Sequence, residues 1–241
     1  MGKKPKSNVR WSIIGLVALA LVTAGVVAFA LSPGRVPAAG AGATFTAEPL
    51  PTVTTAAPKP VVAFLGDSYT VGARATGPAA RWSTIVAGKL GWAEQNFGIS
   101  DTGYFDAGKE ANGAPYHARV SQVAAVKPEI VIVSGGRNDL YRGSQADIDA
   151  AIHKTFHDLR AELPAAKIVA VNPFWGADAV PQQLEAVAAT VKASSAEVGG
   201  TYQDIGQPLQ GHPEWMHADQ VHPVDAGYSA IAQAFIATYK P

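Results

Sequence analysis

Residues 61–70 read VVAFLGDSYT, so that five apolar residues, from Val61 to Leu65, lead directly into a Gly-Asp-Ser turn. An unbroken apolar run of this length is typical of a strand that is buried on both faces of a sheet. Gly66 tolerates backbone conformations that a Cβ atom forbids, so we expect the chain to turn sharply there. Ser68 then lies at the carboxyl end of the strand, where open parallel sheets bind ligands. This serine is either a nucleophile or a residue that caps the following helix.

The same alternation of short apolar runs and helical segments continues from Pro60 to the end of the chain. Strands that alternate with helices imply right-handed crossovers and a parallel sheet with helices on both faces. We therefore predict one α/β domain over residues 60–241, with a parallel sheet of roughly five strands. The predicted strands are 61–65, 93–97, 130–133, 167–171 and 202–205, and the predicted helices are 79–90, 117–126, 148–163, 184–198 and 224–239.

The composition excludes several classes of protein. The chain has no cysteine, which rules out disulfides, thiolate catalysis and cysteine-ligated zinc. Its 19 basic and 19 acidic residues balance overall, but residues 60–241 hold 13 basic and 18 acidic ones, a net charge of about −5. A nucleic-acid-binding domain would show a basic surface instead. We therefore expect no nucleic-acid partner.

A 21-residue stretch without charged side chains, residues 11–31, follows a basic segment at residues 1–10. A helix of that length spans roughly 30 Å, which matches the hydrocarbon core of a bilayer. The basic flank predicts that residues 1–10 stay in the cytoplasm, that 11–31 form one transmembrane anchor, and that the rest of the chain is extracytoplasmic. The alternative is a signal peptide cleaved at Ala28-Phe29-Ala30, which would release a secreted protein. Residues 32–59 are rich in Pro, Ala, Gly and Thr, so we predict a linker there.

Two further polar clusters fall where a site would form in such a sheet. The third predicted strand runs into SGGRND at residues 134–139, and if it neighbours the first strand, Asn138 and Ser68 face the same crevice. An asparagine that only shapes a turn is the alternative. Asp219 and His222 lie in the loop before the last predicted helix, and a carboxylate beside a histidine fixes the tautomer that a general base needs. A polar surface turn is the alternative for this pair.

Together these motifs resemble those of the SGNH, or GDSL-like, hydrolases over about residues 61–236. The matching blocks are Gly66-Asp67-Ser68 for the nucleophile, Gly136-Arg137-Asn138-Asp139 for the Gly-x-Asn-Asp block, and Asp219-x-x-His222-Pro223 for the closing block. The resemblance implies a three-layer α/β/α, flavodoxin-like fold. It also implies a serine nucleophile at Ser68, a general base and then acid at His222, and an orienting carboxylate at Asp219.

The resemblance further implies an oxyanion hole made of the Ser68 N–H, the Asn138 side chain and a backbone N–H from a glycine block after the second strand. Asp101 aligns where that family usually has a glycine, which departs from the family pattern. We expect the Asp101 N–H to donate, with its carboxylate turned away from the developing charge. Gly98 is the alternative donor.

These features predict a membrane-anchored, extracytoplasmic serine ester hydrolase that cleaves carboxylic O-acyl esters through an acyl-enzyme. An acyltransferase with the same residues and a catalytically inactive binding module are the alternatives. Candidate substrates are O-acyl groups on glycans of a bacterial cell envelope, or lipid esters. We expect no cofactor and no metal, since His217 beside Asp219 is more simply a loop histidine than a ligand. Five aromatic residues either wall a substrate pocket or pack in the core: Tyr104, Phe105, Tyr116, Phe174 and Trp175.

Overall fold

The strand predicted at residues 61–65 lies inside the sheet. The computed structural model describes residues 57–109 and 112–241. Within them, five strands form one parallel sheet in the order β2-β1-β3-β4-β5, which confirms the predicted α/β class and strand number. The strands are β1 (Val61–Gly66), β2 (Ala93–Gly98), β3 (Ile130–Ser134), β4 (Lys167–Val171) and β5 (Thr201–Gln203).

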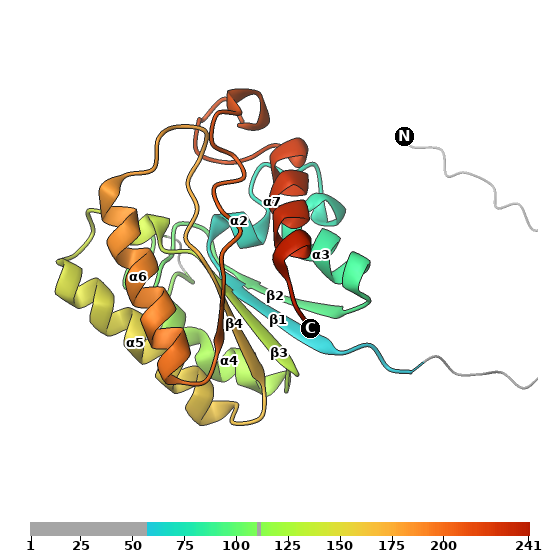
Figure 1. Cartoon of the computed structure of the whole chain (residues 1–241), viewed down its shortest axis with the longest axis vertical. Helices are drawn as coiled ribbons and strands as arrows, with labels where there is room; N and C mark the ends of the chain where they lie inside the picture. The colour runs from blue at the N-terminus through green and yellow to red at the C-terminus, as the bar shows by residue number, and fades with distance from the viewer. Residues whose placement is uncertain (1–56, 110–111) are drawn as a thin grey trace, which may run out of the picture. The chain divides into compact units, whose positions relative to one another are not determined.

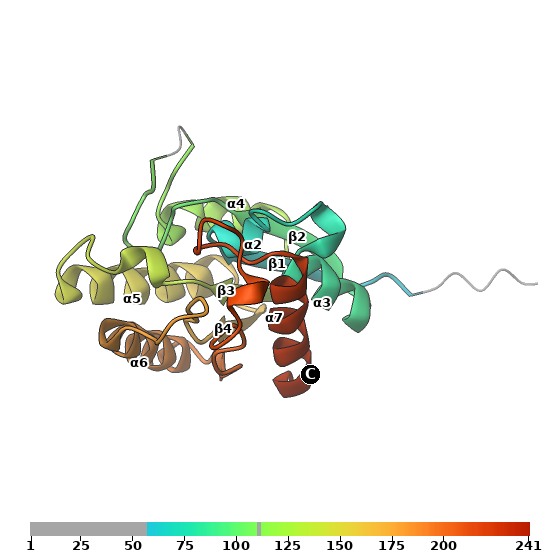
Figure 2. The same cartoon turned by 90° about the horizontal axis from the view of Figure 1, so that it is seen from above.

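Helices cover both faces of this sheet (Figure 1). Ala63 and Leu65 of β1 pack with α4 (Val120–Ala125), α5 (Gln145–Glu162) and α6 (Gln182–Glu197). Val62 and Phe64 pack with α3 (Trp82–Leu90) and α7 (Asp225–Thr238). The two-residue period of a strand sends alternate side chains to opposite faces, so an unbroken apolar run is needed when both faces are covered. Figure 2 shows α5 and α6 on one side and α3 and α7 on the other, seen from above. A short helix, α2 (Ser68–Val71), follows β1, and the 3-10 turns are η1 (Pro78–Ala80), η2 (Tyr116–Arg119), η3 (Arg137–Asp139) and η4 (Pro213–Trp215).

Two predicted helices are each divided in the structure. The helix predicted at 79–90 is interrupted at Arg81, whose extended backbone separates η1 from α3. The helix predicted at 117–126 begins as the 3-10 turn η2 and continues as α4. Apolar spacing does not reveal these breaks, because 3-10 and α-helical turns place side chains on similar faces over so few residues.

The last strand is shorter than predicted. The sequence indicated residues 202–205, but β5 ends at Gln203. The Ile205 N–H donates instead to Asn172 Oδ1 (2.7 Å), so a side chain replaces the next rung of the ladder.

Gly66 is required for space rather than for an unusual backbone angle, which corrects the reason predicted from the sequence. Its backbone lies outside the left-handed region. A Cβ atom on Gly66 would lie 2.7 Å from the carbonyl oxygen of Ser134 and would overlap the side chain of Thr70. The close approach of β1 to β3 and α2 therefore favours glycine at this position.

The sheet order brings the first two motifs together. β1 and β3 are hydrogen-bonded neighbours, with Gly66 opposite Ser134. The segments that carry Ser68 and Asn138 therefore leave the sheet side by side at its carboxyl edge, as the sequence predicted.

Among residues 57–109 and 112–241, no helix has the length and apolar character that crossing a membrane requires. The predicted cytoplasmic segment 1–10, the predicted anchor 11–31 and all but the end of the predicted linker 32–59 lie outside the described residues.

Candidate active site

Ser68 is held at the start of α2 by its own motif. Asp67 caps the helix by accepting the Tyr69 N–H through Oδ1 (2.9 Å), and both Asp67 and Ser68 are buried. Burial raises the pKa of Asp67, whereas the Tyr69 N–H and the positive charge of Arg137 oppose that rise. The N–H groups in the first turn of a helix have no intrahelical acceptor. The Ser68 N–H therefore has no acceptor within α2.

Asn138 lies in η3, directly after β3, and its side chain has a fixed orientation. Nδ2 of Asn138 donates to the carbonyl oxygen of Thr102 (2.9 Å). A carboxamide nitrogen carries two hydrogens, so this bond orients the group and leaves the other N–H for a second acceptor.

Asp139 anchors the loop that follows β2. It is fully buried and accepts the backbone N–H groups of Tyr104 (3.0 Å), Phe105 (2.8 Å) and Asp106 (2.9 Å). Burial raises the pKa of Asp139 to about 6, although the three N–H groups act in the opposite direction. The last residue of the Gly-x-Asn-Asp motif therefore has a structural role: it positions the loop that carries Thr102.

Asp219 and His222 make the contact that the sequence predicted. His222 Nδ1 lies 3.1 Å from Asp219 Oδ2, and Asp219 Oδ1 accepts the backbone N–H groups of Val221 (3.0 Å) and His222 (2.9 Å). Partial burial raises the pKa of Asp219, but these hydrogen bonds and one from Arg74 outweigh it, so the pKa lies well below its usual range. The carboxylate is therefore ionised and can stabilise a positive charge on the imidazole ring.

Two more side chains reach the same carboxylate oxygen. Arg74 Nε donates to Asp219 Oδ2 (3.1 Å), and His217 Nδ1 lies 3.2 Å from that oxygen. No sequence motif indicated Arg74, because it is an exposed loop arginine far from Asp219 along the chain. The backbone N–H of Asp219 donates to Nδ1 of His217 (3.3 Å), which holds the His217 ring against this loop.

Ser68, Asn138 and His222 line one cleft of about 340 Å³ at the carboxyl edge of the sheet. Within the described part of the chain, the Ser68 hydroxyl and the His222 ring make no direct hydrogen bond. Such contacts are often long before substrate binds and tighten in the complex. The walls consist mainly of small or polar side chains. The lining residues are Ser68, Ala73, Arg74, Ser100, Asp101, Asn138, Val221 and His222.

Of the two residues that the sequence left open as a backbone donor, Asp101 lines the cleft and Gly98 does not. The Gly98 N–H is already bonded to Asn96 Oδ1 (2.9 Å), whereas Asp101 lines the cleft. Asp101 has a φ of 62°, a conformation that glycine adopts readily and that aspartate tolerates better than most residues. Its carboxylate lies 3.8 Å from the guanidinium of Arg142.

The five aromatic residues singled out in the sequence do not line this cleft. Tyr104, Tyr116 and Phe174 are buried core residues, so packing is the correct interpretation for these three. Phe105 is 38% exposed, and Trp175 is partly buried against the core.

Tyr69 and Arg137 tie the loop that carries the histidine to the edge of the sheet. Tyr69 Oη donates to the carbonyl oxygen of Val221 (2.6 Å), and Arg137 Nη1 donates to Tyr69 Oη and to the same carbonyl (3.2 Å). Burial raises the pKa of Tyr69 to about 12, so its hydroxyl stays protonated and acts as a donor. Val221 directly precedes His222, so these contacts position the imidazole. No motif in the sequence indicated this role.

A buried arginine joins the strand ends beneath the site. Arg119 donates from Nη1 to the carbonyl oxygens of Gly66 (3.2 Å) and Phe97 (2.6 Å), and from Nη2 to Thr102 Oγ1 (3.1 Å). It therefore connects β1, β2 and the loop that orients Asn138.

Comparison with known proteins agrees with these motifs. Residues 64–230 match the GDSL-like Lipase/Acylhydrolase family. A GDSL lipase of Mycobacterium tuberculosis is 26% identical over 186 residues, which cover 71% of this chain and 78% of that protein. Two of the solved structures that share the fold illustrate this. A lipolytic protein of the G-D-S-L family from Desulfitobacterium hafniense has a TM-score of 0.58 at 17% identity, covering 73% of this chain and 97% of its own.

The second solved structure is a catalytic mutant of an acetylxylan esterase from Geobacillus stearothermophilus, with a TM-score of 0.56 at 22% identity, covering 74% of this chain and 93% of its own. The family match extends over most of the described residues and includes Ser68, Asn138 and His222. The resemblance found in the sequence is thereby confirmed, and the chain belongs to the GDSL-like lipase/acylhydrolase family.

Proposed function

We propose that the protein is a serine ester hydrolase that cleaves carboxylic O-acyl esters through an acyl-enzyme on Ser68. Membership of the GDSL-like lipase/acylhydrolase family supports this class of reaction. The proposal rests chiefly on one cleft that is lined by Ser68, Asn138 and His222, with Asp219 Oδ2 placed 3.1 Å from His222 Nδ1.

In the proposed acylation, His222 Nε2 takes the proton of Ser68 as the serine oxygen attacks the ester carbonyl carbon. Asp219 stabilises the imidazolium that forms. His222 then gives the proton to the leaving alcohol oxygen, and the acyl group remains on Ser68. In deacylation, His222 takes a proton from water as the water oxygen attacks the acyl carbon. The bond between that carbon and Ser68 Oγ then breaks, His222 returns the proton to Oγ, and the carboxylic acid leaves.

Three N–H donors would stabilise the charge that develops on the carbonyl oxygen. They are the backbone N–H groups of Ser68 and Asp101 and the Asn138 side chain. The carbonyl of Thr102 orients the Asn138 amide in advance, so no reorganisation is needed as the charge forms. Arg142, 3.8 Å from the Asp101 carboxylate, reduces the repulsion between that carboxylate and the oxyanion.

The cleft favours a short acyl group on a polar alcohol. Ala73 and Val221 are the apolar residues of its lining, and the other lining side chains are polar or charged. A long acyl chain would require an extended apolar surface to replace water along its length. We therefore infer that acetyl or similarly short esters of sugars fit this cleft better than long-chain lipid esters.

Hydrolysis of p-nitrophenyl esters from acetate to palmitate tests the acyl preference. We expect kcat/KM to be highest for acetate or butyrate and to fall for longer chains. A maximum at a long chain would contradict the inferred substrate class without affecting the proposed chemistry. Appearance of acyl-sugar products when sugars are added would indicate an acyltransferase instead.

Two variants test the chemistry. We expect Ser68→Ala to remove activity and also to prevent labelling by a fluorophosphonate probe, which labels the wild-type protein. Asn138→Ala should lower kcat by about 10² to 10³, because one oxyanion donor is lost. Full activity of Ser68→Ala would overturn the proposal, and an unlabelled, inactive wild-type protein would support a binding module.

We further propose that residues 11–31 anchor the protein in a membrane, with the α/β domain outside the cytoplasm. The support is the uncharged 21-residue stretch that follows a basic segment. Cell fractionation should find the full chain with the membranes and a chain that lacks residues 1–31 in the soluble fraction. Recovery of the full chain as a shortened soluble protein would support signal-peptide cleavage instead.

A further inference from the structure

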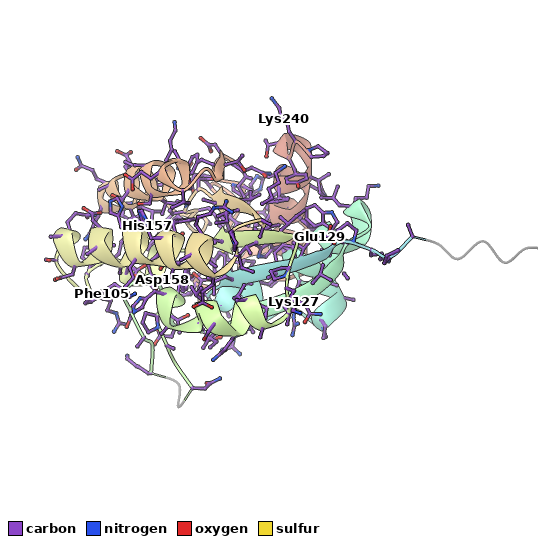
Figure 3. The ribbon with its side chains drawn as sticks, turned by 90° about the horizontal axis from the view of Figure 1, so that it is seen from below. Phe105, Lys127, Glu129, His157, Asp158 and Lys240 are labelled. Carbon is purple, nitrogen blue, oxygen red and sulfur yellow. The ribbon has the colours of Figure 1, made fainter. Side chains whose placement is uncertain are left out.

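Two histidines and one glutamate meet between α5 and α6. His153 and His157 lie four residues apart on α5, so their side chains share one face of the helix, and Glu197 is the last residue of α6. One ligand atom of each side chain lies within 4.8 Å of those of the other two. In Figure 3, His157 lies on the side of α5 that faces α6, away from Asp158. We propose that these three side chains bind a divalent transition metal of the zinc type.

The distances within the cluster are close to those of a tetrahedral site. Glu197 Oε2 lies 3.1 Å from His153 Nδ1 and 3.5 Å from His157 Nε2. A tetrahedral zinc ion with ligands at about 2.0 to 2.1 Å holds its ligand atoms about 3.3 Å apart. Two of the three separations therefore already fit. Rotation of the His157 side chain, which is 59% exposed, closes the third.

The two helices are joined on both sides of the cluster. On the N-terminal side of the cluster, Thr190 Oγ1 on α6 donates to Asp149 Oδ1 on α5 (2.6 Å). On the C-terminal side, Arg160 Nε on α5 donates to the carbonyl oxygen of Val198, which directly follows α6 (2.9 Å). These bonds fix the register of α5 against α6, so a metal would meet ligands on a rigid framework. The buried Ser194 Oγ lies 3.2 Å from His153 Nδ1, and metal binding at Nδ1 would replace this contact.

The ligand types select the metal. Two imidazoles and one carboxylate suit Zn²⁺, Ni²⁺ or Cu²⁺, whereas Mg²⁺ and Ca²⁺ require oxygen ligands. Three protein ligands leave a fourth position for water. None of the three residues lines the cleft that contains Ser68. The metal would therefore stabilise the domain by joining α5 to α6, and the inference does not depend on the proposed esterase activity.

Titration calorimetry of the full-length protein with ZnCl₂ and MgCl₂ tests the site. We expect Zn²⁺ binding with a Kd in the micromolar range and no binding of Mg²⁺. His157→Ala and the double variant His153→Ala/His157→Ala should each weaken Zn²⁺ binding at least tenfold. The matched control is His212→Ala, because His212 is another exposed histidine that contacts a glutamate, Glu214 (2.8 Å). The His212→Ala variant should bind Zn²⁺ with the affinity of the wild-type protein.

Thermal unfolding gives a second readout. At a hundredfold excess over Kd, Zn²⁺ should raise the Tm of the wild-type protein by roughly 5 °C or more and leave that of the double variant unchanged. An equal rise in both proteins would place the metal elsewhere and overturn the inference. Unchanged Zn²⁺ affinity in the double variant, or no Zn²⁺ binding by the wild-type protein at millimolar concentration, would overturn it as well.

Discussion

Asp101 has a φ of 62°, in a region of backbone conformation where a β-carbon is usually disfavoured. The resemblance to the GDSL-like hydrolases implies a glycine at the aligned position. Aspartate is one of the few residues that tolerates this conformation, so the backbone can keep its shape without glycine. At the scale of the single residue, the departure from the family pattern therefore changes the side chain and leaves the N–H in place.

Replacing Asp101 by glycine separates the contribution of the side chain from that of the backbone N–H. We expect Asp101→Gly to keep kcat for p-nitrophenyl acetate within about threefold, because the proposed donor is the backbone N–H. Unfolding stability should stay within about 1 kcal/mol, since relief of the left-handed conformation offsets the greater flexibility of glycine in the unfolded chain.

Lys127→Gly, at another non-glycine position with positive φ (48°) that does not line the cleft, is the matched control for stability. A loss of kcat greater than tenfold in Asp101→Gly would show that the carboxylate itself takes part in the reaction.

At the scale of the element, the loop that carries His222 is held at several points. Met216 and Pro223 form an antiparallel bridge, and the His217 N–H donates to the His222 carbonyl oxygen (2.8 Å). These contacts close the loop on itself. Tyr69 and Arg137 then attach it to the sheet edge through the Val221 carbonyl, as described above.

Removing the Tyr69 hydroxyl should loosen this attachment. We expect Tyr69→Phe to lower kcat about tenfold with little change in KM, because the imidazole is less well positioned while the cleft is intact. The kcat and KM values for p-nitrophenyl acetate measure this. Tyr104→Phe is the matched control: Tyr104 is fully buried, and its hydroxyl has no hydrogen-bond partner in the described part of the chain. Equal losses of kcat in both variants would indicate general core damage rather than loss of positioning.

The Asp219 carboxylate, in the same loop, should contribute both to kcat and to the pH dependence of stability. We expect Asp219→Asn to lower kcat by about 10³ to 10⁴, because an amide cannot hold the His222 tautomer or stabilise the imidazolium. The pKa of Asp219 is lower in the folded protein than in the unfolded chain, so ionised Asp219 stabilises the fold above about pH 4, and this contribution is lost as the pH falls further. The Tm difference between wild type and variant should therefore narrow below about pH 4.

Asp225→Asn is the matched control for that experiment. The pKa of Asp225 is also lowered, mainly by hydrogen bonds from Thr76, so this variant should show a similar narrowing of the Tm difference in acid. It should retain kcat, because Asp225 does not contact His222. A Tm difference for Asp219→Asn that stayed constant from pH 7 to pH 3 would contradict the assigned direction of the shift.

At the scale of the whole molecule, the parallel sheet gathers the site from distant segments. β1 and β3 end beside each other, and the loop before α7 closes over the same edge. The described part of the chain contains the sheet, both helical layers and every residue proposed for the reaction. It should therefore fold and act without the N-terminal segment.

Limited proteolysis of the full-length protein tests this prediction. We expect early cleavage within residues 32–59 and release of a stable fragment that begins near Pro60, because a segment rich in Pro, Ala, Gly and Thr has little apolar surface to bury. Mass spectrometry locates the cut, and the fragment should keep esterase activity. Resistance of residues 32–59 to cleavage would contradict the predicted linker.

Local patterns in the sequence were sufficient for the parallel α/β fold, the approximate positions of its strands and the pairing of Asp219 with His222. These features depend on apolar periodicity and on short motifs, which are readable over a few neighbouring residues. The breaks before α3 and α4 and the early end of β5 were not readable, because single backbone angles and one hydrogen bond from the Ile205 N–H to the Asn172 side chain determine them.

Contacts between distant residues decided the rest of the site. Tyr69 meets Val221 across 152 positions, and Arg74 meets Asp219 across 145, so no local pattern could pair them. The tertiary structure also shows why residue 66 is glycine. The space between β1, β3 and α2 leaves no room for a Cβ atom on Gly66. Side chains that are unremarkable in the sequence acquire a role only when the folded chain brings their partners within hydrogen-bonding distance.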